Sequence, residues 1–284
     1  MIPVVEAFGN TIQGEGKLIG KPAIFVRTFG CNLNCRGFGM PPGTLSNEAD
    51  EIMRDPINQQ AKSIKELPLA KTGCDSYPAI HPLCARLATR YEESDLCDKI
   101  CELAEVGLIK KYDLPLIVFT GGEPLLHKKR IDILMQMLVR RGFHQFMFET
   151  NGTVPVDEFD VLKEPGVEIM FSVSPKLSNS GNTKSIAFKP EAIKSYCKMG
   201  ETYLKFVVDK EGDLAEVNEW VEAFNWTADS NDISHLEVFL MPEGGVLDDR
   251  SRENAKRVAE LCWKYGYRFS PREHLTVFGN AWAK

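Results

Sequence analysis

The second half of the chain alternates short apolar runs with amphipathic segments, and this alternation constrains the fold more than any other feature. The apolar runs have the length and composition of buried strands. Between them, apolar residues recur at helical spacing, and Gly142 and Gly266 stand where two helices should end. We expect strands at 115–120, 145–149, 167–173, 203–208 and 236–241, and helices at 130–141, 189–199, 213–225 and 250–265. This order indicates an α/β fold, a partial (β/α) barrel whose ligands bind at the C-terminal ends of its strands.

A pair of cysteines follows an earlier expected strand, residues 23–29. Cys31 and Cys35 form Cys-x3-Cys, the start of a spacing, Cys-x3-Cys-x2-Cys, in which three cysteines bind three irons of a 4Fe-4S cluster. The third position of that spacing holds Phe38. Either the site is incomplete or its third ligand comes from elsewhere in the chain.

Composition and charge limit the classes of function. The chain has 284 residues, of which 43% are hydrophobic, and a net charge of -6, so we expect a globular protein that does not bind nucleic acid. No apolar run approaches the roughly 18 residues of a membrane span, and residues 1–6 do not resemble a signal peptide. We expect no membrane association, a cytoplasmic location and a small-molecule substrate. The eight cysteines are then expected to be thiols rather than disulfides.

Three successive expected strands end in polar residues. The first runs into Thr120, Gly121, Gly122, Glu123 and Pro124, the second into residues 149–153, and the third into residues 172–176. In a parallel sheet these ends lie at one edge, so their side chains should converge on a single pocket. The glycine-rich segment 8–16 is expected to be a loop that approaches a ligand with its backbone.

Residues 38–72 differ in character, because their apolar positions are sparse. We expect an insertion in a single domain spanning 1–284, with one short helix that begins after Asn47 and ends near Asp55, and a second helix around 59–67.

Motifs along nearly the whole chain resemble those of radical S-adenosylmethionine (SAM) enzymes, and within them the 7-carboxy-7-deazaguanine synthase family. The matching segments are 6–8, 12–16, 22–27, 30–35, 119–124, 149–153, 174–176, 205–208 and 267–272. The family continues from its second cysteine as x-aromatic-Cys-Asp-Thr, whereas this chain has Cys74, Asp75 and Ser76 far downstream. We therefore expect Cys74 to be the third cluster ligand, displaced by the insertion. Lengthening the closed loop to about 39 residues costs only about 2 kcal/mol.

The resemblance implies a carbon-nitrogen lyase that uses a 4Fe-4S cluster, SAM and Mg2+. Such an enzyme cleaves SAM reductively to a 5'-deoxyadenosyl radical and contracts the ring of 6-carboxy-5,6,7,8-tetrahydropterin, with loss of ammonia. The resemblance implies cluster ligation by Cys31, Cys35 and Cys74, Mg2+ binding by Ser76, substrate binding by Ile12, Gln13, Gly14, Glu15, Arg27 and Thr120, and SAM binding by Gly121, Gly122, Glu123, Glu149, Asn151, Ser174, Pro175 and Lys176. It also implies an electron donor such as flavodoxin or ferredoxin, and leaves a homodimer open.

Three alternatives stay open. The chain could be another radical SAM enzyme, such as a glycyl-radical activase, or a homologue without a cluster that acts as a binding protein. A second Cys-x3-Cys, Cys97 and Cys101, is expected to pack in a helix with Leu96 and Ile100 rather than bind metal. The isolated Cys84, Cys197 and Cys262 are expected to be packed thiols as well.

Overall fold

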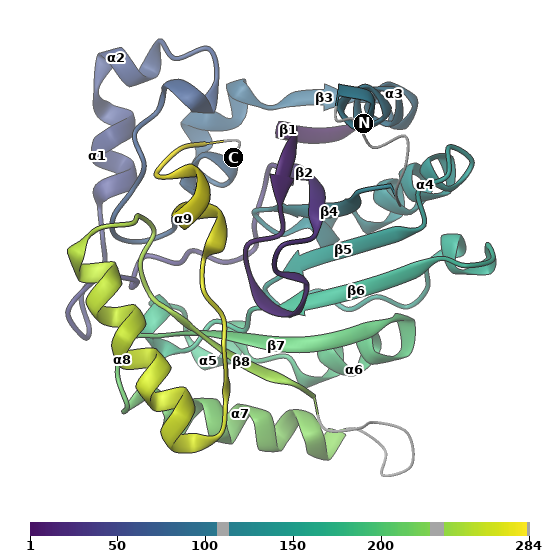
Figure 1. The fold of residues 1–284 in the computed structure, drawn as a ribbon. Helices are drawn as coiled ribbons and strands as arrows, with labels where there is room; N and C mark the ends of the chain where they lie inside the picture. Colours follow the sequence, from purple (N-terminus) through teal and green to yellow (C-terminus); the bar gives the residue numbers. More distant parts are fainter. Residues whose placement is uncertain (107–113, 228–235, 283–284) are drawn as a thin grey trace.

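The computed structural model of the protein describes residues 1–106, 114–227 and 236–282, which form one nine-stranded sheet with helices around it (Figure 1). The strands are β1 (Ile2–Ile12), β2 (Pro22–Thr28), β3 (Thr89–Tyr91), β4 (Leu116–Gly121), β5 (Gln145–Thr150), β6 (Glu168–Val173), β7 (Glu201–Val208), β8 (Val238–Pro242) and β9 (Arg268–Phe269). The helices are α1 (Glu48–Arg54), α2 (Pro56–Gln59), α3 (Glu93–Val106), α4 (Lys128–Val139), α5 (Lys184–Ala187), α6 (Pro190–Met199), α7 (Asp213–Thr227), α8 (Asp249–Tyr265) and α9 (Glu273–Phe278).

The sheet has the order β3-β1-β2-β4-β5-β6-β7-β8-β9. β1 pairs antiparallel with β2 and β3, and from β2 to β9 all neighbours are parallel. Because β3 and β9 lie at opposite ends of this order, the sheet is an open, partial barrel, as the sequence predicts. The five strands and four helices expected in the second half occur within a few residues of their predicted bounds.

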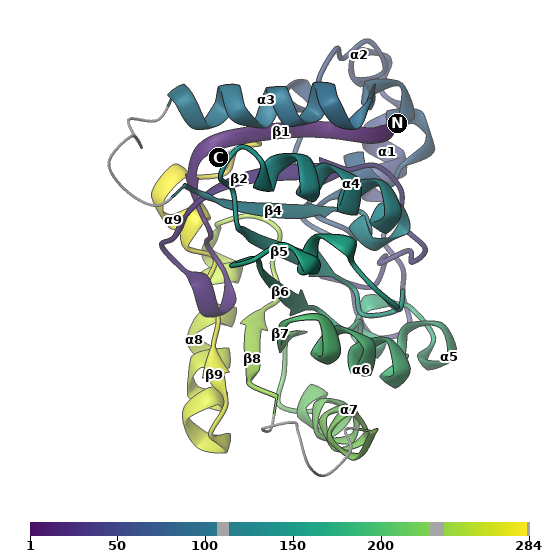
Figure 2. The same cartoon turned by 90° about the vertical axis from the view of Figure 1, so that its right-hand side faces the viewer.

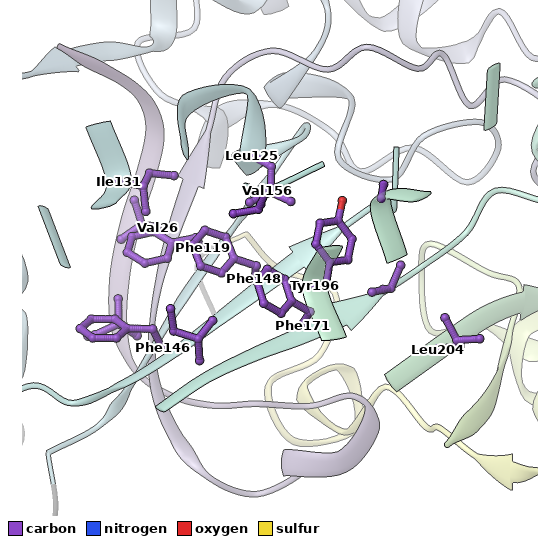
Figure 3. Close-up of a cluster of buried hydrophobic side chains, with 14 of the residues drawn as sticks. Val26, Phe119, Leu125, Ile131, Phe146, Phe148, Val156, Phe171, Tyr196 and Leu204 are labelled. Carbon is purple, nitrogen blue, oxygen red and sulfur yellow. The ribbon is translucent and has the colours of Figure 1, made fainter. Parts of the chain in front are cut away.

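The outer face of the sheet carries the main hydrophobic core, which helices α3, α4, α6 and α7 cover (Figure 2). Aromatic side chains from neighbouring strands stack across it: Phe119, Phe148 and Phe171 form successive contacts with ring centroids 5.2 and 5.5 Å apart (Figure 3). Tyr196 of α6 continues the stack at 4.7 Å from Phe171. Cys97 lies in this core with Leu96 and Ile100, as predicted.

The inner face of the sheet is apolar at one end and polar at the other. A smaller cluster that includes Phe8 and Phe239 fills its N-terminal end. Toward the C-terminal end, four strands change from apolar to polar on this face: Phe25 to Arg27, Val118 to Thr120, Met147 to Glu149, and Tyr203 to Lys205. Side chains two residues apart on a strand share a face, so each polar residue stands directly above an apolar floor.

The structure differs from the sequence prediction in three places. Segment 8–16 is a loop only in part, because β1 continues to Ile12 and pairs with β2. The α-helix expected at 59–67 is absent: α2 lies earlier and ends at Gln59, since Pro56 begins it with Asp55 as its cap, and only a 3-10 helix, Ile64–Glu66, follows. β1, β3, β9 and α9 were not expected from the sequence.

In the described part of the chain, no helix is both long and apolar enough to cross a membrane.

The insertion is built around its own small hydrophobic cluster. Met53, Ala61, Leu67 and Ala70 pack there with residues that follow the insertion, Tyr77 among them. This cluster is separate from the main core. The insertion is therefore a local structure that stands beside the C-terminal end of the barrel, next to α9 (Figure 1).

Candidate active site

A cavity of about 270 Å³ at the C-terminal end of the parallel strands collects most of the predicted site residues. Those that line it are Ile12, Gln13, Glu15, Arg27, Cys31, Cys35, Cys74, Ser76, Thr120, Gly121, Gly122, Glu149, Asn151, Ser174 and Lys176. The lining does not include Gly14, Glu123 or Pro175. The polar strand ends thus meet in one place, as the parallel topology requires.

The structure brings Cys74 to the same cavity as Cys31 and Cys35. The chain leaves for the insertion and returns from it at a single point, where the Gly73 N–H donates to the Phe38 carbonyl at 2.7 Å. Cys74 comes directly after Gly73, so this hydrogen bond places it near position 38, where the uninterrupted spacing would have its third cysteine. Gly37 itself is fixed, because its N–H donates to the Ser180 carbonyl at 2.9 Å.

The surroundings of the three sulfurs are apolar, with a few directed donors. Burial raises the pKa of Cys35 to about 11 and that of Cys74 well above its ordinary value. Burial also raises the pKa of Cys31. The Asn182 side-chain N–H lies 3.3 Å from the Cys35 sulfur, and the Leu33 backbone N–H lies 3.4 Å from that of Cys31. Such thiols stay protonated by themselves and become thiolates when a metal binds them.

The two glycines of the Thr120–Pro124 motif allow the end of β4 to pack against the loop that carries Cys31. A Cβ atom at Gly122 would lie 2.0 Å from the Gly30 carbonyl oxygen, and Gly121 has a φ of +123°. Two backbone hydrogen bonds join the segments, from Gly122 to Thr28 at 3.2 Å and from Glu123 to Gly30 at 2.8 Å. Glycine is therefore required at these positions for the two backbone segments to approach each other, whether or not a ligand also contacts them.

Glu123 lies behind the cavity wall and is fully buried. One carboxylate oxygen accepts from the Thr150 hydroxyl at 2.8 Å and from the Leu125 N–H at 3.1 Å, and the other accepts from the Asn151 N–H at 2.7 Å. Burial raises its pKa to about 7, while these donors oppose the shift. Glu123 therefore holds the end of β5 in place, and with it Asn151, which does line the cavity.

Arg27 projects from the end of β2 into the cavity. Its Nε donates to the Glu6 carboxylate at 2.8 Å, and one terminal nitrogen donates to the Ser76 hydroxyl at 2.9 Å. Burial alone would lower its pKa, but the Glu6 carboxylate outweighs it, and the pKa is raised. The second oxygen of Glu6 is buried without a hydrogen-bond partner. The charged Arg27 guanidinium therefore lies next to Ser76, two residues after Cys74.

A chain of charged side chains, most of them buried, also lines the cavity. Glu15 forms ion pairs with Lys205 and with Arg272, whose Nε lies 3.5 Å from its carboxylate. Arg272 continues to Asp75 at 2.5 Å. Burial would raise the pKa of Glu15, but these cations lower it to about 2. Glu15 is therefore an ionised acceptor at neutral pH.

Three further hydrogen bonds join polar side chains that line the cavity. Glu149 accepts from the Gln13 amide at 3.2 Å and from the Thr120 hydroxyl at 2.8 Å. The Lys176 ammonium donates to the Ser174 hydroxyl at 2.7 Å. Glu149 of β5 thus ties Thr120 of β4 to Gln13, which follows β1.

Several residues of the cavity received no role from the sequence, among them Asp75, Lys205, Arg272, His274 and Trp282. Lys205 had a signal, since it lies two residues after Tyr203 on the inner face of an expected strand. Arg272 closes the family-like segment 267–272 but was given no role, whereas His274 and Trp282 gave no signal, because they follow the last predicted helix and reach the cavity only through the tertiary fold. Phe38, which occupies the position of the third cysteine, lines the cavity as well.

Comparison with known proteins finds relatives along almost the whole chain. The 7-carboxy-7-deazaguanine synthase of Halobacterium salinarum is 30% identical over 303 residues, a match that covers 99% of this chain and 91% of that protein. The chain belongs to the 7-carboxy-7-deazaguanine synthase family. The synthase of Hyperthermus butylicus is 28% identical and covers 98% of this chain and 93% of its own length.

Two further comparisons agree with this family assignment. The model of the radical SAM superfamily matches residues 74–179, a match that begins at Cys74. The crystal structure of QueE from Escherichia coli matches 95% of this chain and 93% of its own with a TM-score of 0.53; at 22% identity it supports the fold alone. The relatives named here are synthases, which leaves the alternative of a glycyl-radical activase without support.

Membership of the superfamily implies a 4Fe-4S cluster and SAM, and the donors in the cavity fit them. Three cysteine thiols line one cavity, next to glycine backbone, an amide and an ammonium group. In the described part of the chain, no three His, Cys, Asp or Glu side chains gather tightly enough to hold a single metal ion. A cluster makes a different demand, because each cysteine binds a different iron.

Proposed function

We propose that the protein is a 7-carboxy-7-deazaguanine synthase, which converts 6-carboxy-5,6,7,8-tetrahydropterin to 7-carboxy-7-deazaguanine with loss of ammonia. The observation that carries the proposal is that Cys31, Cys35 and Cys74 share one cavity with Arg27 and Glu15. A set of iron ligands and a set of groups for an anionic, nitrogen-rich substrate thus face the same space, in a chain whose family relatives carry this name.

Cys31, Cys35 and Cys74 would hold the cluster, with its fourth iron left for SAM. Gly121, Gly122, Asn151, Ser174 and Lys176 line the cavity nearby and would bind SAM through backbone groups, an amide and an ammonium. When bound, the cluster and SAM supply an organic radical that removes a hydrogen atom from the substrate. The Asn151 side chain is already held in position, since its N–H donates to Asn32 at 3.0 Å and lies 3.8 Å from the Cys31 sulfur. Glu123 and Pro175 would support this region from behind the lining.

Arg27 would bind the carboxylate of the substrate, a pairing that suits a planar guanidinium. The N–H groups of a pterin need acceptors, and the ionised Glu15 supplies one at the end of β1. Gln13 and Thr120 already hydrogen-bond with Glu149, so this side of the cavity is ordered before the substrate arrives. Ile12 would contribute an apolar contact, and Gly14 would contribute backbone.

Mg2+ would bind at Ser76, next to the substrate carboxylate. The Ser76 hydroxyl accepts from Arg27 at 2.9 Å and keeps a second lone pair for a cation. Mg2+ prefers oxygen ligands and retains several waters, so one protein hydroxyl is a sufficient contact when the substrate supplies another oxygen. An external electron donor, such as flavodoxin or ferredoxin, would reduce the cluster.

Turnover of the carboxypterin by the anaerobically reconstituted protein tests the proposal. We expect product by mass spectrometry only when reductant and SAM are both present. Arg27→Gln should raise KM for the substrate at least tenfold and leave the iron content unchanged, because the guanidinium meets the substrate and not the cluster. Arg141→Gln, which changes an exposed ion pair with Asp98 of α3, is the matched control. Full iron content without product in the wild-type protein would overturn the proposal.

A further inference from the structure

The C-terminal segment 273–282 connects two loops that are far apart in the sequence, and both border the cavity. Its first residue contacts the loop that follows β1, which holds the proposed substrate ligands Gln13, Gly14 and Glu15 and is called the substrate loop below. There the Glu273 N–H donates to the Gly14 carbonyl at 2.9 Å. The contact is tight: a Cβ atom at Gly14 would lie 2.2 Å from Nδ1 of His274. Helix α9 follows and turns its buried Leu275 toward the cavity.

The far end of this segment is fixed twice. The Asn280 side chain forms two hydrogen bonds with the backbone of Leu247, accepting at 2.6 Å and donating at 3.0 Å. The Trp282 indole N–H then donates to the Leu67 carbonyl of the insertion at 2.8 Å. Its ring packs edge-on against Tyr77, with centroids 6.3 Å apart at 71°. Trp282 thus belongs to the small cluster on which the insertion is built.

These contacts place the insertion and the C-terminal segment on one side of the cavity. Leu69 of the insertion and Leu275, Ala281 and Trp282 of the C-terminal segment all line it. Without the insertion, Trp282 would lose the carbonyl that accepts its N–H and much of the apolar surface under its ring. The free energy of such a contact is modest, but it fixes the position of a whole segment.

We propose that the insertion, residues 38–72, is the dock for the C-terminal segment, and that Trp282 latches this segment over the cavity. The proposal rests on the proposed function, because closure matters for a reaction that must exclude water. Trp282 is a positioning residue: it holds α9, and through α9 the substrate loop at Gly14. Lengthening the loop between the second and third cysteines thereby gives the enzyme a second wall for its substrate site.

Substitution of Trp282 in the reconstituted enzyme tests the latch. Trp282→Ala should raise KM for the carboxypterin about tenfold, equivalent to about 1.4 kcal/mol, with kcat within about twofold and iron content unchanged. Amides of α9 should exchange with solvent about tenfold faster, while those of β4 keep their rates. Trp282→Phe keeps a ring against Tyr77 but loses the donor to Leu67, so its KM and exchange rates should fall between.

Trp263→Ala is the matched control, because this tryptophan on α8 is 92% exposed; its KM and exchange rates should equal those of the wild type. Wild-type KM and α9 exchange in both Trp282 variants would overturn the latch. If the wild-type protein fails to turn over the carboxypterin, the proposed function fails by itself, and the exchange rates still decide whether Trp282 holds the segment.

Discussion

Position 74 carries the site at the scale of single residues. Cys74 is one of the three thiols proposed as iron ligands, and it shares a cavity with Cys31 and Cys35 because the chain returns from the insertion to Phe38. We expect Cys74→Ala to lower the iron content from about four per chain to near zero, since two thiolates are a poor anchor for a cluster. Cys197→Ala, at a packed cysteine of α6, should keep its iron. Iron and sulfide analysis after anaerobic reconstitution measures both; a Cys74→Ala protein with full iron would contradict the assignment.

Glu15 gives a second prediction at this scale, with a defined dependence on pH. Its folded pKa, about 2, lies below the ordinary value of 4.5, so its ion pairs stabilise the fold fully above pH 4.5 and lose this effect as the pH falls toward 2. Glu15→Gln should therefore be less stable than the wild type by about 3 kcal/mol near neutral pH, and the difference should shrink over this window. Urea unfolding of the cluster-free protein measures it. Adding Lys205→Met should recover part of the loss, because Lys205 then no longer stands unpaired; a constant difference from pH 6 to 2 would refute the pairing.

At the scale of elements, buried groups behind the cavity hold the strand ends in register. Glu123 accepts from the backbone of both Leu125 and Asn151, so either orientation of an amide at this position sets an N–H against a backbone N–H. We expect Glu123→Gln to lower the free energy of unfolding by about 1–3 kcal/mol, seen by urea unfolding. Glu168→Gln, at an exposed position on β6, should change it by less than about 0.5 kcal/mol. Equal stability of the two variants would contradict the role given to Glu123.

What the sequence predicts, and what it leaves out, also differs by element. Strands β4 to β8 and their helices follow from the alternation of apolar runs, because burial of whole strands leaves a strong local pattern. Arg27 follows from the resemblance to the family, whereas Thr120 and Glu149 follow from polar residues at those strand ends. Trp282 and Arg272 do not, since their contacts with Leu67 and Asp75 join segments about 200 residues apart, and no local pattern encodes such a pair. The fold of the insertion was mispredicted at 59–67 for a related reason: its cluster is completed by Tyr77 and Trp282 from outside it.

At the scale of the whole molecule, strand pairing leaves the barrel open, and a hydrogen bond and an ion pair join the loop after β1 to the far part of the sheet. The Gly16 N–H, after β1, donates at 2.9 Å to the hydroxyl of Ser270, which follows β9. Lys205 of β7 forms an ion pair with Glu15 of the same loop after β1. The chain that follows β9 therefore depends on the chain that follows β1. If the loop after β1 binds the substrate as proposed, we expect that binding to be coupled to the position of α9.

Gly14→Ala tests this closure, because the added Cβ would lie 2.2 Å from Nδ1 and 2.7 Å from the backbone nitrogen of His274. Backbone cannot yield as a flexible side chain can, so α9 must move away from the loop. We expect KM for the carboxypterin to rise about tenfold, with the iron content unchanged because the cysteines lie on other segments. Gly212→Ala, where the nearest atom to a new Cβ is 3.9 Å away, should behave as the wild type. A Gly14→Ala enzyme with wild-type KM would show that the substrate loop and α9 are not coupled, and the barrel would then have to be closed without α9, by the Glu15–Lys205 pair and the Gly16–Ser270 hydrogen bond.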